Sequence, residues 1–233
     1  MSYAPGAQDD GTQAPGPLAD RVALARCGEA VRARLAADPT AYRLPTDQAE
    51  IFAFGEFLSP AECERMIGLV DATAQPSIVY DEPRQSDFRT SYSGDVDRDD
   101  PFVRMIERRI DDLLGLEASW GEAIQGQRYH PGQQFMAHYD WFWTRAAYWP
   151  AEAARGGQRA WTAMAYLNDV EEGGQTQFTR LGLSVAPQPG ALLVWNNATP
   201  DGAPNFATMH AALPVVRGVK YVITKWYRTR KWG

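Results

Sequence analysis

The stretch Phe135-Met136-Ala137-His138-Tyr139-Asp140-Trp141-Phe142 decides the fold, because it places an imidazole and a carboxylate two positions apart. On a β-strand, residues i and i+2 point to the same face, so His138 and Asp140 can reach one metal ion. A second imidazole, His210, follows much later in the chain. Two imidazoles and one carboxylate form the facial set that holds mononuclear Fe(II) and leaves coordination positions open. We therefore predict an iron site at these three residues.

Lys220 lies shortly after His210, in the strand-like run 219–226. A lysine is ordinarily solvated at the surface. The apolar neighbours Val219, Val222 and Ile223 favour burial instead, and a buried ammonium would bind a carboxylate inside a barrel. We therefore predict that Lys220 anchors an anionic co-substrate beside the metal.

The alternative to a metal site is that these residues have ordinary structural roles. His-x-Asp on a strand often occurs by chance, and the case for metal binding depends on the second histidine and the lysine that follows it. The third histidine of the chain, His130, precedes Pro131-Gly132. Proline and glycine mark a turn, so we expect His130 to lie in a solvated loop.

Bulk composition limits the class of protein. The chain has 233 residues, of which 45% are hydrophobic, and a net charge of −6. This length suits one domain, and the negative charge argues against a surface for nucleic acid or anionic membranes. Cys27 and Cys63 form no paired-cysteine framework, and neither a signal peptide nor an apolar run long enough to span a membrane is apparent. We therefore expect a cytoplasmic protein with no membrane or nucleic-acid partner.

The first half of the chain is predicted to be mostly helical. Residues 1–17 are rich in Pro, Gly, Ala, Gln and Asp, which predicts a disordered tail. Ser59-Pro60 has the form of a helix start, and residues 48–57 before it resemble a strand. Residues 76–100 resemble a long loop with short strands. Apolar residues recur at helical spacing in three segments: 18–35, 61–72 and 102–114.

From residue 120 the pattern changes to short β-rich runs broken by Gly, Pro and Asn. Such a pattern is typical of a barrel or jelly roll. We predict a mainly β (α+β) protein in which N-terminal helices flank a double-stranded β-helix, the cupin-like jelly roll. Residues 18–233 would form one domain, with helical support at 18–119 and the catalytic β core at 120–230.

Over roughly residues 50–230 the chain resembles the prolyl 4-hydroxylase branch of the 2-oxoglutarate-dependent oxygenases. Two shorter segments upstream also match, Phe57–Cys63 and Phe88–Ser91. The motifs are specific for the superfamily and weak on the substrate. They are R-Y-x-x-G-Q-x-F-x-x-H-x-D-x-F (128–142), Q-R-x-x-T-A-M-x-Y-L-N-D-V-E-E-G-G-Q-T-x-F (158–178), P-Q-P-G-A-L-L-V-W-N-N (187–197) and H-A-A-L-P-V-x-x-G-x-K-Y-x-x-T-K-W (210–226).

This resemblance implies Fe(II) as cofactor, 2-oxoglutarate and O2 as co-substrates, and ascorbate as reductant. Tyr129 and Thr176 would join Lys220 in binding the far carboxylate of 2-oxoglutarate, although ordinary strand packing explains the first two equally well. Trp226 matches a tryptophan that shapes the pocket near the iron. Related halogenases carry Gly or Ala in place of Asp140, so this aspartate favours hydroxylation.

Substrate residues are implied by the resemblance alone. Arg89, Ser91, Glu122 and Arg159 match positions that contact peptide in prolyl hydroxylases. Family members often have Tyr where this chain has Phe135, so one phenolic hydroxyl is missing. The aromatic segment Trp141–Gly157 would form a lid or peptide platform, or pack over the barrel rim. Residues 77–94 would close from the other side.

The leading hypothesis is hydroxylation of a prolyl residue in a peptide or protein, with release of succinate and CO2. A second hypothesis keeps the chemistry but takes a free amino acid or small metabolite. Two others come from different classes: a cupin-like metal enzyme that uses no 2-oxoglutarate, and a non-catalytic peptide-binding module. Lys220 with Tyr129 argues against the first of these, and the intact metal set against the second.

Overall fold

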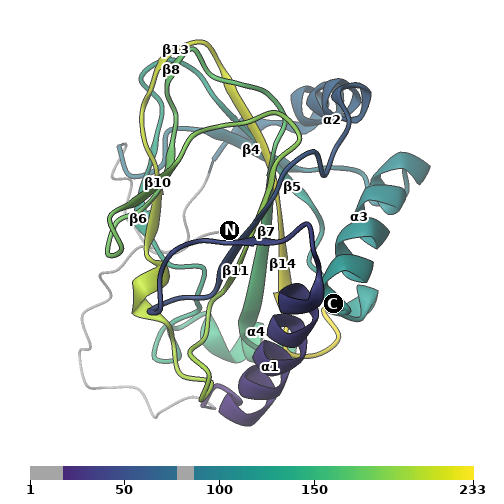
Figure 1. Cartoon of the computed structure of the whole chain (residues 1–233), viewed down its shortest axis with the longest axis vertical. Coiled ribbons are helices and arrows are strands. Elements are labelled where there is room, and N and C mark those ends of the chain that lie inside the picture. Colours follow the sequence, from purple (N-terminus) through teal and green to yellow (C-terminus); the bar gives the residue numbers. More distant parts are fainter. Residues whose placement is uncertain (1–17, 78–86) are drawn as a thin grey trace.

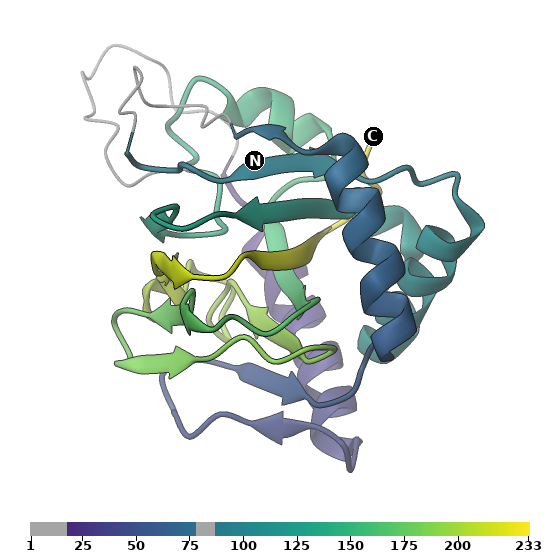
Figure 2. The same cartoon turned by 90° about the horizontal axis from the view of Figure 1, so that it is seen from above.

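A computed structural model describes residues 18–77 and 87–233 of the chain. The predicted tail 1–17 and residues 78–86, half of the predicted loop 77–94, lie outside this part. Two antiparallel sheets face each other, and helices cover the outer face of the larger sheet (Figures 1 and 2). The predicted mixed α+β architecture with a double-stranded β-helix core is confirmed.

The eight-stranded sheet draws strands from both halves of the chain. The strand β2 from the mainly helical first half pairs with β11 near one edge, and β4 pairs with β5 near the other. In spatial order its strands are β1 (Tyr42–Arg43), β2 (Ile51–Phe54), β11 (Leu192–Asn196), β7 (Arg159–Tyr166), β14 (Lys220–Arg228), β5 (Gln125–Tyr129), β4 (Tyr92–Asp95) and β3 (Gln75–Pro76).

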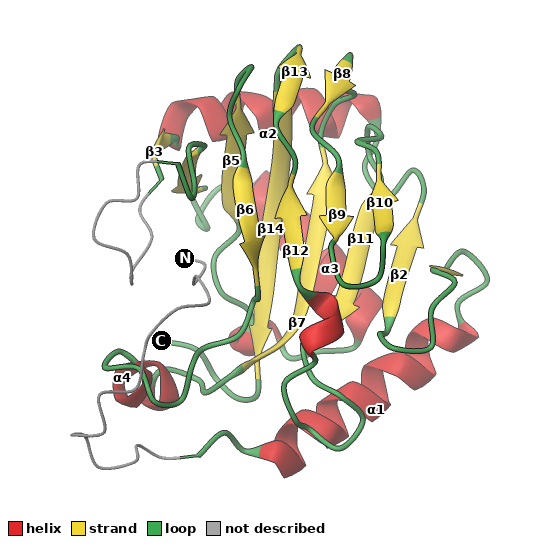
Figure 3. Ribbon diagram, turned by 90° about the vertical axis from the view of Figure 1, so that its left-hand side faces the viewer, coloured by secondary structure: helices red, strands yellow, loops and turns green. Residues whose placement is uncertain are grey.

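The second sheet stands in front of the first in Figure 3. Its strands, in spatial order, are β10 (Leu183–Val185), β9 (Thr176–Phe178), β12 (His210–Ala212) and β6 (Phe135–His138). Two short antiparallel strands that are distant in the sequence, β8 (Glu172–Gly173) and β13 (Val215–Arg217), pair beyond it. The space between the two sheets is where the predicted metal ligands have to meet.

The helices begin and end close to the predicted positions. The three long ones are α1 (Arg21–Ala37), α2 (Pro60–Thr73) and α3 (Pro101–Leu114). Ser59 caps α2 as expected: its hydroxyl accepts from the Glu62 backbone amide, and the Glu62 carboxylate accepts from the Ser59 amide. The remaining helices are short: α4 (Trp149–Ala154) and the 3-10 turns η1 (Ala118–Trp120) and η2 (Phe206–Thr208). In the described ranges, no helix combines the length and apolar character that a bilayer crossing requires.

Alternate residues of β7 divide between two cores. Trp161, Ala163 and Ala165 pack into the cluster formed with α1, α2 and α3, whereas Met164 and Tyr166 belong to the cluster between the sheets. The strand β14 alternates in the same way, because side chains on a strand point to opposite faces in turn. The inner faces of β7 and β14 therefore become the wall of the barrel interior.

A buried group of charges joins α3 to the outer face of β14. Lys225 is 1% exposed, and its Nζ lies 2.8 Å from Glu107 Oε1 and 3.9 Å from Asp111 Oδ1. Tyr227 donates from its hydroxyl to Asp111 Oδ1 over 2.5 Å. These contacts fix the helix against the strand that carries Lys220 and Trp226 on its other face.

Replacing Lys225 by Met should destabilise the fold, because Asp111 would lose its buried cationic partner. Breaking a buried pair from one side costs about 3–5 kcal/mol, and Arg98, 3.6 Å from Glu107, keeps the expected loss near the lower value. The control is Arg217→Met, since the Arg217–Glu172 pair is largely exposed and such pairs contribute less than about 1 kcal/mol. Urea unfolding measures both; equal losses in the two variants would contradict the proposed role of Lys225.

Candidate active site

The three predicted metal ligands meet between the sheets. His138 ends β6 and His210 begins β12, and the two residues are paired in register. Asp140 lies beyond the end of β6, so the expectation that it shares the strand with His138 is wrong. It is nevertheless brought to both imidazoles: Oδ1 is 4.0 Å from His138 Nε2, and Oδ2 is 3.7 Å from His210 Nε2.

Backbone carbonyls orient both imidazoles. Nδ1 of His138 lies 2.8 Å from the Met136 carbonyl, and Nδ1 of His210 lies 3.0 Å from that of Thr208. A carbonyl oxygen only accepts, so each Nδ1 carries the proton and each Nε2 keeps its lone pair. This arrangement is the usual second interaction of a metal-bound histidine. Both lone pairs therefore face the space beside Asp140.

The carboxylate of Asp140 is buried and only half satisfied. Its Oδ2 accepts a hydrogen bond of 2.9 Å from the Thr162 hydroxyl, while Oδ1 makes no hydrogen bond of good geometry in the described part of the chain. The Trp226 side chain lies close enough to the carboxylate to help lower its pKa, but its indole nitrogen also makes no hydrogen bond of good geometry among these residues. Burial raises the pKa of Asp140, but the two imidazoles and Arg159 outweigh it, so the net shift is downward. Burial and the neighbouring His210 hold the pKa of His138 well below its usual range. A neutral imidazole and an ionised carboxylate are the forms that bind metal.

These residues fit a single Fe(II). One ligand atom from each of His138, Asp140 and His210 lies within 4.8 Å of the others, and all three side chains are buried. A buried carboxylate oxygen without a partner is costly, and a divalent cation beside Oδ1 would remove that cost. Three protein ligands on one side leave the rest of the coordination sphere for co-substrate and O2.

Lys220 lies inside the same pocket, on the first residue of β14. It is 1% exposed, so it is not a surface lysine. Its Nζ lies 3.5 Å from Thr176 Oγ1. The ring centres of Tyr129 and Tyr166 lie 5.4 and 5.5 Å from the same nitrogen. Burial lowers the pKa of Lys220 to about 7, and no carboxylate of the described residues offsets this. Lys220 is therefore a buried amine with no carboxylate partner among the described residues.

The hydroxyls near this ammonium belong to Thr176, which contacts it, and to the two flanking tyrosines, which donate to other acceptors. Tyr166 donates to Thr176 Oγ1 over 2.8 Å, so the Thr176 hydroxyl hydrogen is left to point elsewhere. Tyr129 donates to Gln127 Oε1 over 2.7 Å. The predicted anion contacts Tyr129, Thr176 and Lys220 thus line one pocket with the metal ligands and Trp226, and their contact with a carboxylate stays a prediction.

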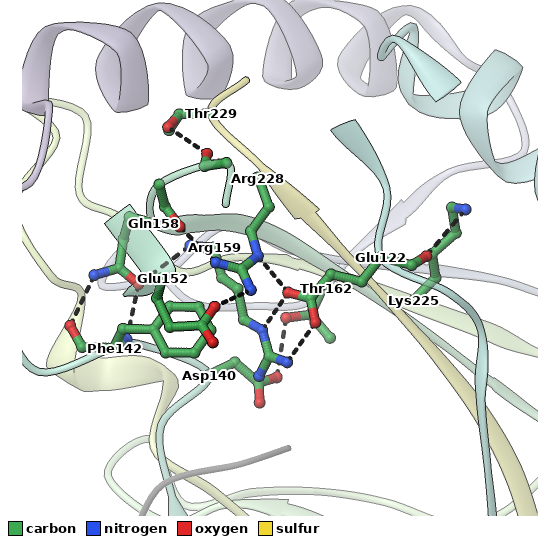
Figure 4. A network of polar contacts seen from close by, with 12 residues as sticks. Glu122, Asp140, Phe142, Glu152, Gln158, Arg159, Thr162, Lys225, Arg228 and Thr229 are labelled. Carbon is green, nitrogen blue, oxygen red and sulfur yellow. Dashed lines mark hydrogen bonds and ion pairs between the residues drawn. The ribbon is translucent and has the colours of Figure 1, made fainter. Parts of the chain in front are cut away.

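The four predicted substrate residues form two buried pairs. Arg89 donates to Ser91 Oγ over 3.1 Å, and its guanidinium lies 4.6 Å above the Phe135 ring. Arg159 makes a two-point contact with Glu122, 2.7 Å for each bond (Figure 4). Its guanidinium lies 3.9 Å above the Trp226 ring. Arg159 is therefore not a solvated loop residue. Their contact with substrate stays a prediction.

Glu122 also binds a second arginine, Arg228. Arg228 donates to Glu122 Oε1 over 2.5 Å and to Glu152 Oε2 over 2.6 Å. Burial raises the pKa of Glu122, but Arg159 and then Arg228 lower it to about 2. The carboxylate is therefore ionised and held by two guanidiniums, and Glu152 balances the second of them.

The aromatic segment 141–157 is partly helical and mostly packed. Trp141 and Trp149 are buried, whereas Trp143 and Tyr148 are half-buried. Of the two predicted roles, packing over the rim therefore describes Trp141 and Trp149. His130 lies edge-on to Tyr92, 6.0 Å between ring centres, and apart from the metal ligands.

The motifs alone did not single out four polar residues that hold the site in place. They are Gln127, Thr162, Tyr166 and Asn197. Thr162 and Tyr166 share the inward side of β7 with Met164, so the two-residue period of that strand could have indicated them. Asn197 follows the end of β11, and its contact with Thr162 depends on the pairing of strands that are distant in sequence.

Comparisons with known proteins agree on one family. The model of the 2OG-Fe(II) oxygenase superfamily matches residues 124–228. Probable prolyl 4-hydroxylase 3 of Arabidopsis thaliana is 34% identical over 199 residues, covering 75% of this chain and 68% of the relative. Prolyl 4-hydroxylase subunit alpha-1 of Rattus norvegicus is also 34% identical, over 79% of this chain but only 35% of that subunit.

Solved structures are similar as well. The viral collagen prolyl hydroxylase of Paramecium Bursaria Chlorella virus-1, solved as a 2OG complex, is 25% identical and covers 76% of this chain and 94% of its own, with a TM-score of 0.60. A Trichoplax adhaerens prolyl hydroxylase in complex with a hypoxia inducible factor peptide fragment has a TM-score of 0.59 at 15% identity, covering 88% of this chain and 90% of its own. At that identity the likeness shows the fold alone.

Binding of 2-oxoglutarate should weaken as pH rises above about 7. The free site loses the Lys220 proton near that pH, so the anion then has to bind with uptake of a proton, which costs up to about tenfold in affinity per pH unit. Lys220→Met should bind about 10–150-fold more weakly at pH 6.5, the effect of a lost charged hydrogen bond. Calorimetry on anaerobic Fe(II)-loaded protein measures both.

The Lys220→Met variant is also the control for the pH dependence, because it keeps the same metal ligands as the natural protein. Its pH profile should be flatter than that of the natural protein. Equal slopes, or equal affinity at pH 6.5, would contradict the role of Lys220 as anchor.

Proposed function

The chain belongs to the prolyl 4-hydroxylase-like 2OG-Fe(II) oxygenases, and on this basis we propose that it hydroxylates prolyl residues in a peptide or protein. The metal set His138, Asp140 and His210 makes it a 2-oxoglutarate-dependent dioxygenase. Bound Fe(II), with 2-oxoglutarate and O2, supplies the oxidising power for an unactivated C–H bond, and succinate and CO2 are released. We propose ascorbate as the reductant that keeps the iron active.

The observation that carries the peptide proposal is the fixed guanidinium of Arg159 beside the metal ligand Asp140. Arg159 is 1% exposed, held at two points by Glu122, and stacked on Trp226, which lines the metal pocket. A donor fixed in this way can orient a backbone carbonyl next to the reacting carbon. The names of the relatives support proline as the residue oriented there.

The other residues of the pocket would either bind 2-oxoglutarate or form the apolar walls. Lys220 and Thr176 would hold the outer carboxylate of 2-oxoglutarate, so that its keto-acid end reaches the metal ligands. Trp226 and Phe135 line the pocket between them, and Phe135 stacks on the His138 ring with 3.6 Å between ring centres. These apolar walls exclude water from the reacting centre.

The direct test is a panel of single-proline peptides and free proline, incubated with enzyme, Fe(II), ascorbate and 2-oxoglutarate. Mass spectrometry should show the gain of one oxygen in peptides, with succinate formed in equal amount. Reaction of free proline alone would replace the proposal with a small-metabolite hydroxylase. Succinate formation without any oxidised substrate would leave the dioxygenase assignment and remove the prolyl one.

Arg159→Gln should lower kcat/KM for a reactive peptide by about 10–150-fold, corresponding to about 1.5–3 kcal/mol for a lost charged hydrogen bond. Glu122 keeps Arg228 as partner, so we expect the variant to fold. Arg217→Gln, an exposed arginine far from these contacts, is the control. Peptide kinetics within twofold of the natural enzyme would remove Arg159 from the substrate site.

A further inference from the structure

The carboxylate of Asp140 is supported by two polar residues that are not among the predicted metal ligands, one in direct contact and one behind it. Thr162, on β7, donates to Asp140 Oδ2 over 2.9 Å (Figure 4). Asn197, just after β11, donates from Nδ2 to Thr162 Oγ1, also over 2.9 Å. All three side chains are buried, at 2%, 0% and 3% exposure for Asp140, Thr162 and Asn197. The three form a chain of hydrogen bonds that ends at the metal ligand.

The direction of this chain follows from donor chemistry. An ionised carboxylate only accepts, so the Thr162 hydroxyl has to give its single hydrogen to Asp140. Oγ1 of Thr162 is then only an acceptor toward Asn197, and the Asn197 side chain has to present its amide nitrogen. The amide carbonyl Oδ1 of Asn197 is correspondingly left without a partner among the described residues. Neither hydrogen bond can reverse while Asp140 is ionised.

We propose that Thr162 and Asn197 are positioning residues that restrict Asp140 to binding the metal through Oδ1 alone. Oδ2 is occupied by the hydroxyl, whereas Oδ1 is buried with no hydrogen-bond partner. Asp140 lies after the end of β6 and lacks the ladder hydrogen bonds that fix His138. Thr162 from the facing sheet, itself held by Asn197, replaces that support. A carboxylate held to one oxygen also leaves the remaining metal positions for co-substrate and O2.

This inference concerns the metal centre and does not depend on the identity of the substrate. Its test measures Co(II) affinity in the absence of 2-oxoglutarate, by the visible absorption of the bound metal, with thermal melting to confirm folding. Thr162→Val should lower the affinity by about 10–100-fold, the usual effect of losing such a supporting hydrogen bond. Thr162→Ser keeps the hydroxyl and should restore most of the affinity.

The matched control is Thr224→Val. Thr224 is a buried threonine that lines the same pocket, but its hydroxyl accepts from Gln127 Nε2 and has no contact with Asp140. Its Co(II) affinity should stay within threefold of the natural protein. Unchanged affinity in Thr162→Val, or equal losses in the Val and Ser variants of Thr162, would overturn the proposal.

Asn197→Leu provides an independent test, also in case Thr162→Val does not fold. Because Asn197 reaches the carboxylate only through Thr162, its replacement should lower Co(II) affinity by a smaller factor, about 3–10-fold. In a Thr162→Val background it should have no further effect, since residues that act through one another are not additive. Unchanged affinity in the single Asn197 variant, or full additivity in the double variant, would overturn the chain of hydrogen bonds.

Discussion

The two-residue alternation of β7 and β14 is the constraint on which the rest of the molecule depends. One face of each strand packs against the helices, and the other lines the barrel interior. On the inner face of β14 this places Lys220, Val222, Thr224 and Trp226 in a row toward the pocket. On β7 it places Thr162 against Asp140 and Tyr166 against Thr176. A shift of register by one residue would exchange these faces and remove anchor, wall and carboxylate support together.

The outer face of β14 carries the other half of the same pattern. Lys225 points to α3, where Glu107 and Asp111 compensate its charge. Lys220 points inward and, among the described residues, contacts the Thr176 hydroxyl and two tyrosine rings but no carboxylate. The two lysines are equally buried and differ in whether the fold itself supplies the counter-charge. A compensated buried charge indicates structure, and an uncompensated one indicates a ligand, because burial without a partner is costly. By the same argument, the buried Asp140 Oδ1, which carries negative charge and makes no hydrogen bond among the described residues, indicates a bound cation.

Residue spacing alone indicated the metal set, the buried lysine and the order of helices and strands. Each of these depends on local patterns: His-x-Asp, an apolar run around Lys220, and apolar residues at helical spacing. The contacts that the sequence did not reveal are those between strands far apart in the chain. Asn197 reaches Thr162 only because β11 lies beside β7, and Arg228 reaches Glu122 only because β14 pairs with β5 and with the residues just before it. The strand assignment of Asp140 was wrong because His210 pairs with His138 and the ladder ends there.

The pairing of β14 with β5 also explains how the residues around Glu122 are held in place. Arg228, at the end of β14, contacts Glu122 before β5, Glu152 on α4 and the Gly157 carbonyl. Three segments that are distant in the sequence are thus joined at one guanidinium. The planar fork of arginine suits this task, because its donors are fixed relative to one another. Glu122 uses its remaining capacity to hold Arg159 against Trp226. The Arg159 side chain is therefore fixed in one conformation before any ligand binds. Less conformational entropy is then lost when a substrate contacts it.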